Sequence, residues 1–397
     1  MSAQALRMPR SGFGRGQVHA VAGCYFVASF AALGLPPYLT EILPELGDRD
    51  ARWAGVLYVV PTVFGALGAP LWGRLADRYG RKRLLLRAQL GLALSFLLAG
   101  WADSLATFTV ALVLQGILGG TFAASNGYLG AALEGPALSK ALTLMQGSAR
   151  AALVAAPILV GSLSGRLSPH RQYALLAVLP LTAALLLAAL PEPAPAEEPR
   201  REPQSISAEV PAVRSLKGLF ALEFAFVFST VISFPYLIEL VHDRLPGASP
   251  ALTGVLFALP HLCYLGAALA VHAAFRSRPR AGLVLGFACI ALGLAGHGIA
   301  GSLTALIAVR LLLGAGLTLG LVCLSVLAAD SAKGRAPGKL FGSLEFFSKA
   351  GAVAAGVTAA AGSARYGPAA PVLIGGAAAA VTAALLPTLH LRTRWSH

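Results

Sequence analysis

A few ionisable side chains lie deep inside long apolar runs of this sequence: Arg150, Glu223, Glu345 and Lys349. A charged side chain at the centre of a membrane helix costs ~2.5 to 3.5 kcal/mol or more, so such residues mark binding sites and ion pathways. A buried cation can bind an anionic ligand, and a buried carboxyl group can take up and release a proton. These residue types therefore predict ligand binding or proton transfer within an apolar environment.

The elements that must position these side chains follow from the composition. The chain has 397 residues, of which 56% are hydrophobic and only 12% are charged, whereas soluble domains are about 25% charged. The apolar runs are long enough to cross ~30 Å of hydrocarbon as helices that rise ~1.5 Å per residue. We therefore expect an all-α membrane protein with twelve membrane-spanning helices, at residues 18–40, 53–73, 84–101, 105–130, 141–165, 172–190, 217–241, 251–274, 281–300, 304–328, 339–363 and 369–389.

The charges outside the spans predict how the chain crosses the membrane. Arg7, Arg10 and Arg15 precede the first run, which is too long for a cleaved signal peptide and lacks a small-residue cleavage site. If this run is an uncleaved helix with its amino end inside, most of the 31 Lys and Arg residues fall on cytoplasmic segments. We expect a protein of the inner membrane with both termini in the cytoplasm. This topology accounts for the net charge of +14 without nucleic acid as a partner.

The two parts of the chain resemble each other when one is shifted by 198 or 199 residues. Pro37-Tyr38-Leu39 matches Pro235-Tyr236-Leu237, and Gly55-Val56-Leu57 matches Gly254-Val255-Leu256. Parallel repeats of this kind are found in transporters whose substrate site lies between the two halves, near the middle of the bilayer.

A polar, proline-rich segment at residues 191–216 separates the two repeats. Such a composition cannot form a packed core. We therefore expect an N-terminal six-helix bundle at residues 1–190, a cytoplasmic linker at 191–216 and a C-terminal six-helix bundle at 217–397.

A charged motif at residues 73–86 lies between two apolar runs. It resembles the G-x-L-a-D-r-x-G-r-[KR] signature between the second and third helices of major facilitator superfamily transporters. The positions that match are Gly73, Asp77, Arg78, Gly80, Arg81 and Lys82. The resemblance implies the superfamily fold, transport by alternating access, and a gate in which Asp77 faces the amino end of the eleventh helix, near residues 337–339. It also implies a monomer that is not an enzyme and needs no cofactor or metal.

The fifth span contains Ala156-Pro157 and Gly161, which is similar to a weakened form of the G-P-x-x-G-G motif of exporters in this superfamily. With this motif, the sequence resembles the drug and metabolite/proton antiporter branch. The resemblance implies export of a small organic molecule coupled to protons. The cargo could be an anionic metabolite such as a carboxylate siderophore. The alternative is a multidrug efflux pump for hydrophobic or cationic compounds.

The predicted binding residues combine the repeat with the buried charges. Arg150 and Lys349 superpose under the 199-residue shift, and as a symmetric pair they would bind an anion. The alternative is that Glu345, four residues before Lys349 on the same helix face, neutralises that lysine. Tyr25, Glu345 and Asn126 complete the predicted substrate site.

The predicted proton-coupling residues are Glu223 and His261. A single membrane histidine can equally be a packing residue between helices. Arg310 starts an R-x-x-x-G pattern that resembles one in the fourth helix of many family members, although the fourth-helix position here is Leu112. We expect Arg310 to lie near the external surface and extend toward it, the alternative being a counterpart of the family's arginine.

The sequence lacks the motifs of a membrane enzyme and of a zinc site. The chain has no HExxH, GxSxG or phosphate-loop motif, which argues against a membrane enzyme. Its four cysteines, Cys24, Cys263, Cys289 and Cys323, lie in apolar spans without the paired spacing of a zinc site.

Overall fold

The computed structural model describes residues 14–133, 135–190, 213–332 and 337–388. Regular structure within these ranges is α-helical or 3₁₀-helical, which confirms the all-α prediction. Most of the predicted linker, residues 191–212, lies outside the described residues. The first half contains α1 (Arg15–Gly34), η1 (Pro36–Tyr38), α2 (Leu39–Ile42), η2 (Leu43–Leu46), α3 (Ala54–Tyr79), α4 (Arg81–Gly100), α5 (Leu105–Leu118), α6 (Thr121–Ala132), α7 (Gly135–Leu163), α8 (Pro169–Leu176) and α9 (Val178–Ala188).

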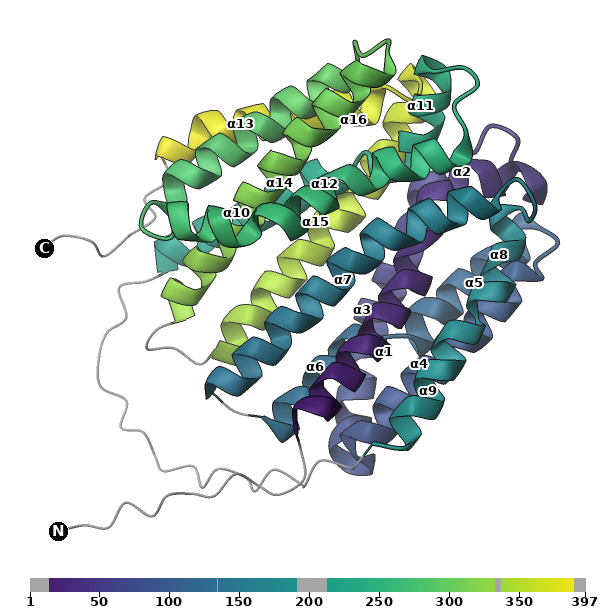
Figure 1. Ribbon diagram of the computed structural model, residues 1–397, viewed down its shortest axis with the longest axis vertical. Helices are drawn as coiled ribbons and strands as arrows, with labels where there is room; N and C mark the ends of the chain where they lie inside the picture. The colour runs from purple at the N-terminus through teal and green to yellow at the C-terminus, as the bar shows by residue number, and fades with distance from the viewer. Residues whose placement is uncertain (1–13, 134, 191–212, 333–336, 389–397) are drawn as a thin grey trace, which may run out of the picture.

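The second half follows the same plan. It contains α10 (Val213–Val231), η3 (Phe234–Tyr236), α11 (Leu237–Arg244), α12 (Pro250–Phe275), α13 (Pro279–His297), α14 (Leu303–Ala332), α15 (Pro337–Tyr366), α16 (Ala370–Leu385) and η4 (Leu386–Thr388). Each predicted span coincides with one of these helices or with two or three consecutive ones. In Figure 1, α1 to α9 occupy the lower right of the bundle and α10 to α16 its upper part.

Eight segments of the described chain are long and apolar enough to span a membrane by length and composition. Three shorter apolar helices, at residues 54–69, 105–118 and 370–385, correspond to the second, fourth and twelfth predicted spans. The eleventh predicted span is α15, a 30-residue helix that carries Glu345 and Lys349. Its charges lower its hydropathy without shortening the helix.

The fourth predicted span is broken into α5 and α6. Gly119 and Gly120 separate the two helices, and Gly120 has a φ of +83°, a left-handed conformation that favours glycine. The break leaves the last carbonyl groups of α5 without helical partners. Trp72 Nε1 donates to the carbonyl of Ile117 at 2.6 Å, and Arg87 Nη1 donates to that of Leu118 at 2.5 Å.

The two halves approach most closely where α3 meets α15 and where α7 meets α12. A Cβ atom added to Gly55 would lie 2.4 Å from the carbonyl oxygen of Gly356, and one added to Gly254 would lie 2.3 Å from that of Pro157. Only glycine permits such a short distance between helices. Gly55 and Gly254 are equivalent under the 199-residue shift, so the two crossings are related by the internal repeat.

Two tyrosines of the repeat lie at these same crossings. Tyr38 donates a hydrogen bond to the carbonyl of Pro157 at 2.5 Å and lies against Gly254 of the second half. Tyr236 accepts a hydrogen bond from the amide of Gly55 in the first half at 3.2 Å. The Pro-Tyr segment of each half therefore contacts the glycine of the other. We call this region, residues 36–55 and 234–254, the closed end of the bundle.

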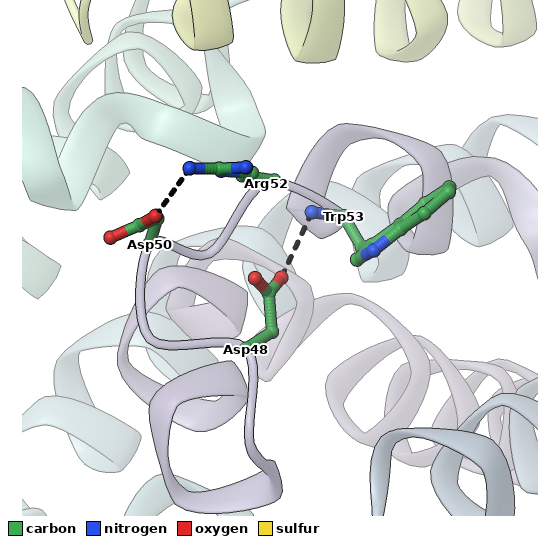
Figure 2. Close-up of polar contacts among 4 residues, drawn as sticks. All are labelled: Asp48, Asp50, Arg52 and Trp53. Atoms are coloured by element: carbon green, nitrogen blue, oxygen red, sulfur yellow. Dashed lines mark hydrogen bonds and ion pairs between the residues drawn. The ribbon is translucent and has the colours of Figure 1, made fainter.

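A short loop before α3 completes the closed end. Asp48 accepts a hydrogen bond from the amide of Trp53 at 3.0 Å, and Arg52 pairs with Asp50 at 2.8 Å, as Figure 2 shows. Arg52 and Asp50 are both about two-thirds exposed, at 68% and 66%, so their ion pair contributes little stability. The backbone carbonyl of Arg52 lies 3.4 Å from the Tyr236 hydroxyl, which can donate to it.

The expectation that Arg310 reaches the external surface is wrong. Its side chain on α14 is 1% exposed, and it donates hydrogen bonds to the carbonyls of Leu256 at 2.7 Å and Phe257 at 2.8 Å on α12. Pro260 explains this contact, because proline has no amide hydrogen to donate to the carbonyl four residues before it. Arg310 therefore bonds the Leu256 carbonyl that Pro260 leaves without a helical partner.

We expect Arg310→Met to lower the free energy of unfolding by ~1.5 to 3 kcal/mol, the contribution of a hydrogen bond to a charged group. Adding Pro260→Ala should restore part of this loss, because alanine supplies the missing amide donor to Leu256. Thermal unfolding of the four variants in detergent measures both effects. An Arg310→Met protein that unfolds at the wild-type temperature would contradict this role.

Candidate functional site

Three of the predicted site residues come together from three helices. Tyr25 on α1 is buried, with 5% exposure, and interacts electrostatically with Arg150 on α7 and Glu345 on α15. Because α1 and α7 belong to the first half and α15 to the second, this cluster bridges the two halves. A ligand held here would contact both halves at once.

Glu223 joins the same cluster from α10. Its carboxylate accepts a hydrogen bond from the Ser348 hydroxyl on α15 and lies within electrostatic range of Glu345. Glu223 is half-buried, whereas the Glu345 side chain is 66% exposed. The two carboxylates therefore share one region but differ in their access to solvent.

Lys349 pairs with Glu345, which agrees with the alternative prediction that Glu345 neutralises this lysine. Its Nζ lies 3.4 Å from Glu345 Oε1, four residues earlier on α15, and the lysine side chain is 40% exposed. Arg150 is held differently, because its guanidinium carbon lies 5.5 Å from the centre of the Tyr264 ring on α12. The symmetric pair therefore consists of one ion-paired lysine and one arginine over an aromatic face.

Aromatic rings extend the cluster along α10 and α15. Phe220 and Phe347 stack with ring centres 5.1 Å apart, and Phe224 and Phe228 stack at 6.3 Å. Phe346 is 67% exposed beside Phe347. Together with Tyr25 and Tyr264, these rings offer apolar faces close to the charged groups.

Sequence reasoning did not single out Tyr264 and Ser348. An aromatic or hydroxyl residue inside an apolar run carries no signal of its own. Tyr264 faces Arg150 across the crossing of α7 and α12, and that crossing could have been inferred from the repeat of Gly55 and Gly254.

Of the two other predicted site residues, His261 lies within electrostatic range of Arg150, and Asn126 is only partly described. His261 on α12 is buried and packs against the rings of Phe234 and Phe257, with ring centres 5.9 Å away in each case. These contacts resemble those of a packing residue between helices. Asn126 lies on α6, and its side chain is outside the described residues.

Parts of the charged motif tie the helices of the first half together. Gly80 separates α3 from α4 with a φ of +96°, so the turn requires glycine. Arg81 donates to the carbonyl of Gly127 at 2.9 Å, and Lys82 donates to that of Ala188, the last residue of α9, at 2.9 Å. A cation there complements the negative carboxyl end of a helix. The surroundings of Gly73 and the side chains of Asp77 and of residues 337–339 are outside the described residues, while Arg78 is exposed.

Comparison with known proteins identifies the family. A sequence profile described as Major Facilitator Superfamily matches residues 21–246, more than half of the 397-residue chain. The chain belongs to the major facilitator superfamily. It is therefore a multi-pass membrane protein of a transporter family, and this membership confirms that it is not an enzyme.

Curated relatives of the chain include proteins named "Multidrug resistance protein MdtG". The one from Proteus mirabilis is 33% identical over 147 residues, which is 36% of this chain and 36% of that protein. The one from Serratia proteamaculans is 32% identical over 169 residues, or 42% of this chain and 39% of that protein. The matched segments thus span about two-fifths of these relatives or less.

Solved structures with the same fold extend over nearly the whole chain. A peptide transporter POT in complex with sulfate has a TM-score of 0.75 and 16% identity, covering 96% of each chain. The human organic anion transporter MFSD10 (TETRAN) has a TM-score of 0.67 and 20% identity, covering 94% of this chain and all of that one. At these identities the likeness shows the fold alone.

The exposure of Lys349 and Glu345 predicts a weak ion pair. A double-mutant cycle of Lys349→Ala and Glu345→Ala should give a coupling energy below about 1 kcal/mol, as for other exposed pairs on one helix. Thermal unfolding of the two single variants and the double variant measures it. A coupling of about 3 kcal/mol, typical of a buried pair, would mean that the lysine is shielded from water during the protein's working cycle.

Proposed function

We propose that this protein exports small organic molecules from the cytoplasm across the inner membrane in exchange for protons. The observation that carries the proposal is the cluster of Tyr25, Arg150, Glu223 and Glu345, which unites charged groups from both halves inside an apolar bundle. A site that contacts both halves can be exposed to one side and then the other as the halves rock. The multidrug resistance relatives support export as the direction.

The cargo that the cluster fits best is hydrophobic and aromatic. Stacked rings on α10 and α15 provide apolar faces, and Lys349 is already paired with Glu345. This favours the multidrug alternative over a carboxylate siderophore bound by two cations. An anionic aromatic cargo is the second candidate, because Arg150 lies over the Tyr264 ring and makes no ion pair with a carboxylate among the described residues.

The remaining elements of the proposal follow the sequence predictions. The two six-helix halves move as units, joined by the cytoplasmic linker at 191–216, and both termini face the cytoplasm. The closed end then faces outward, because the charged motif lies at the opposite end of α3 from Gly55. The motif residues Gly73, Asp77, Arg78, Gly80, Arg81 and Lys82 act as the cytoplasmic gate, and the protein works as a monomer.

We propose Glu223 as the proton-coupling group, because it is the half-buried carboxylate of the cluster and bonds a hydroxyl on the facing helix. Glu223→Gln keeps the size of the side chain but removes the proton site. Export of a fluorescent substrate into everted membrane vesicles should then lose its stimulation by an imposed pH gradient.

The matched control for this experiment is Glu345→Gln, because that carboxylate lies in the same cluster but is 66% exposed. We expect this variant to keep its response to the gradient. If Glu223→Gln responds to the gradient like the wild type, the coupling group lies elsewhere. Binding of the substrate to both purified variants separates loss of coupling from loss of binding.

Two substitutions separate the candidate cargoes. Phe347→Ala should weaken binding of aromatic compounds of any charge by about 0.5 to 1.5 kcal/mol, the contribution of a ring pair. Arg150→Ala should weaken only anionic compounds, by ~1.5 to 3 kcal/mol. Calorimetric titration with a matched cationic and anionic aromatic pair measures both. Equal losses for the two compounds in Arg150→Ala would exclude recognition of cargo charge by this arginine.

A further inference from the structure

A groove with a volume of about 450 Å³ lies on the outside of the first half, away from the cluster described above. It runs along α4 beside the carboxyl end of α5. Two arginines line one part of it and apolar residues line the rest: Arg83, Arg87, Leu86, Leu90, Gly91, Leu94 and Leu118. No acidic side chain is among these lining residues.

The groove faces the surroundings of the bundle. Arg83, Arg87, Leu90 and Leu94 follow one another at intervals of three or four residues, so they form a single stripe along α4. Leu90 is 52% exposed and Leu94 is 49% exposed. In a membrane-spanning helix, such an outward stripe of leucines contacts lipid acyl chains.

Both arginines lie in the first two turns of α4. α4 begins at Arg81, so Arg87 is about 9 Å along the helix at ~1.5 Å per residue. Its guanidinium carbon lies 3.4 Å from the centre of the Trp72 ring, and tryptophan is typical of the membrane interface. Cations at the mouth of an apolar groove between helices are suited to an anionic headgroup.

Arg87 has a structural role at the break between α5 and α6, whereas Arg83 has none among the described residues. Arg87 bonds the carbonyl of Leu118, so it has a structural role. Arg83 is exposed, and no hydrogen bond or ion pair holds it among the described residues. Under the 199-residue shift, Arg83 and Arg87 correspond to Gly282 and Gly286. The cationic stripe therefore belongs to the first half only and is not a consequence of the repeat.

We propose that this groove binds one acidic phospholipid. Its phosphate group lies between Arg83 and the outward edge of Arg87, and one acyl chain follows Leu90 and Leu94 along α4. Charge complementarity and the apolar continuation of the groove both favour this occupant. The site overlaps the end of the charged motif at residues 73–86 and is separate from the cargo cluster.

The test measures lipid binding to the purified full-length protein by native mass spectrometry, with phosphatidylglycerol and phosphatidylcholine as probes. We expect wild-type protein to retain one phosphatidylglycerol in preference to phosphatidylcholine. Arg83→Gln should weaken phosphatidylglycerol binding about fivefold, which corresponds to the ~1 kcal/mol that a basic residue contributes at a membrane surface. It removes no structural bond, so folding should be unchanged.

Two further variants make the result specific. Leu90→Trp fills the groove without changing charge and should also weaken phosphatidylglycerol binding. The control is Arg276→Gln combined with Arg278→Gln, which removes two cations near the junction of α12 and α13, outside the groove. The proposal would be overturned if Arg83→Gln and Leu90→Trp both bound phosphatidylglycerol as the wild type does. An equal loss in the control would also overturn it, because the attraction of the lipid to basic residues would then be general.

Discussion

The need to bond every backbone carbonyl in an apolar environment shapes this bundle more than any other constraint. Pro260 and the Gly119–Gly120 break each leave backbone carbonyl groups without a helical partner. Arg310 bonds the Leu256 carbonyl in the first case, and Trp72 and Arg87 bond the end of α5 in the second. Arginine and tryptophan side chains thus stabilise helices that are not continuous.

The sequence predicted the spans and most of the cluster for a simple physical reason. Apolar runs of membrane length form helices wherever they occur, and a charge within such a run must find a partner. Arg150, Glu223 and Glu345 were therefore visible as candidates before their neighbours were known, and the structure brings them together. The ion pair between Lys349 and Glu345 could also be predicted, because residues four apart on a helix lie on the same face.

The remaining features depend on which helix faces which, and a single sequence does not reveal that. Position along α14 suggested that Arg310 could reach the surface, but its rotation on the helix points it at α12. Tyr264 carried no signal because its partner comes from the other half. The span predicted at residues 105–130 did not reveal the break at Gly119 and Gly120, since glycines in membrane helices also serve close packing.

The crossed contacts at the closed end also bear on how such a chain could arise. Each half carries both a Pro-Tyr segment and a glycine. Tyr38 of the first half contacts Gly254 of the second, and Tyr236 of the second half contacts Gly55 of the first. This reciprocity is the defining property of an isologous interface in a two-fold dimer. A single six-helix unit would therefore have contained a self-complementary surface before duplication and fusion. The two halves of the present chain are still held together by this reciprocal pair of contacts, each joining a tyrosine of one half to a glycine of the other.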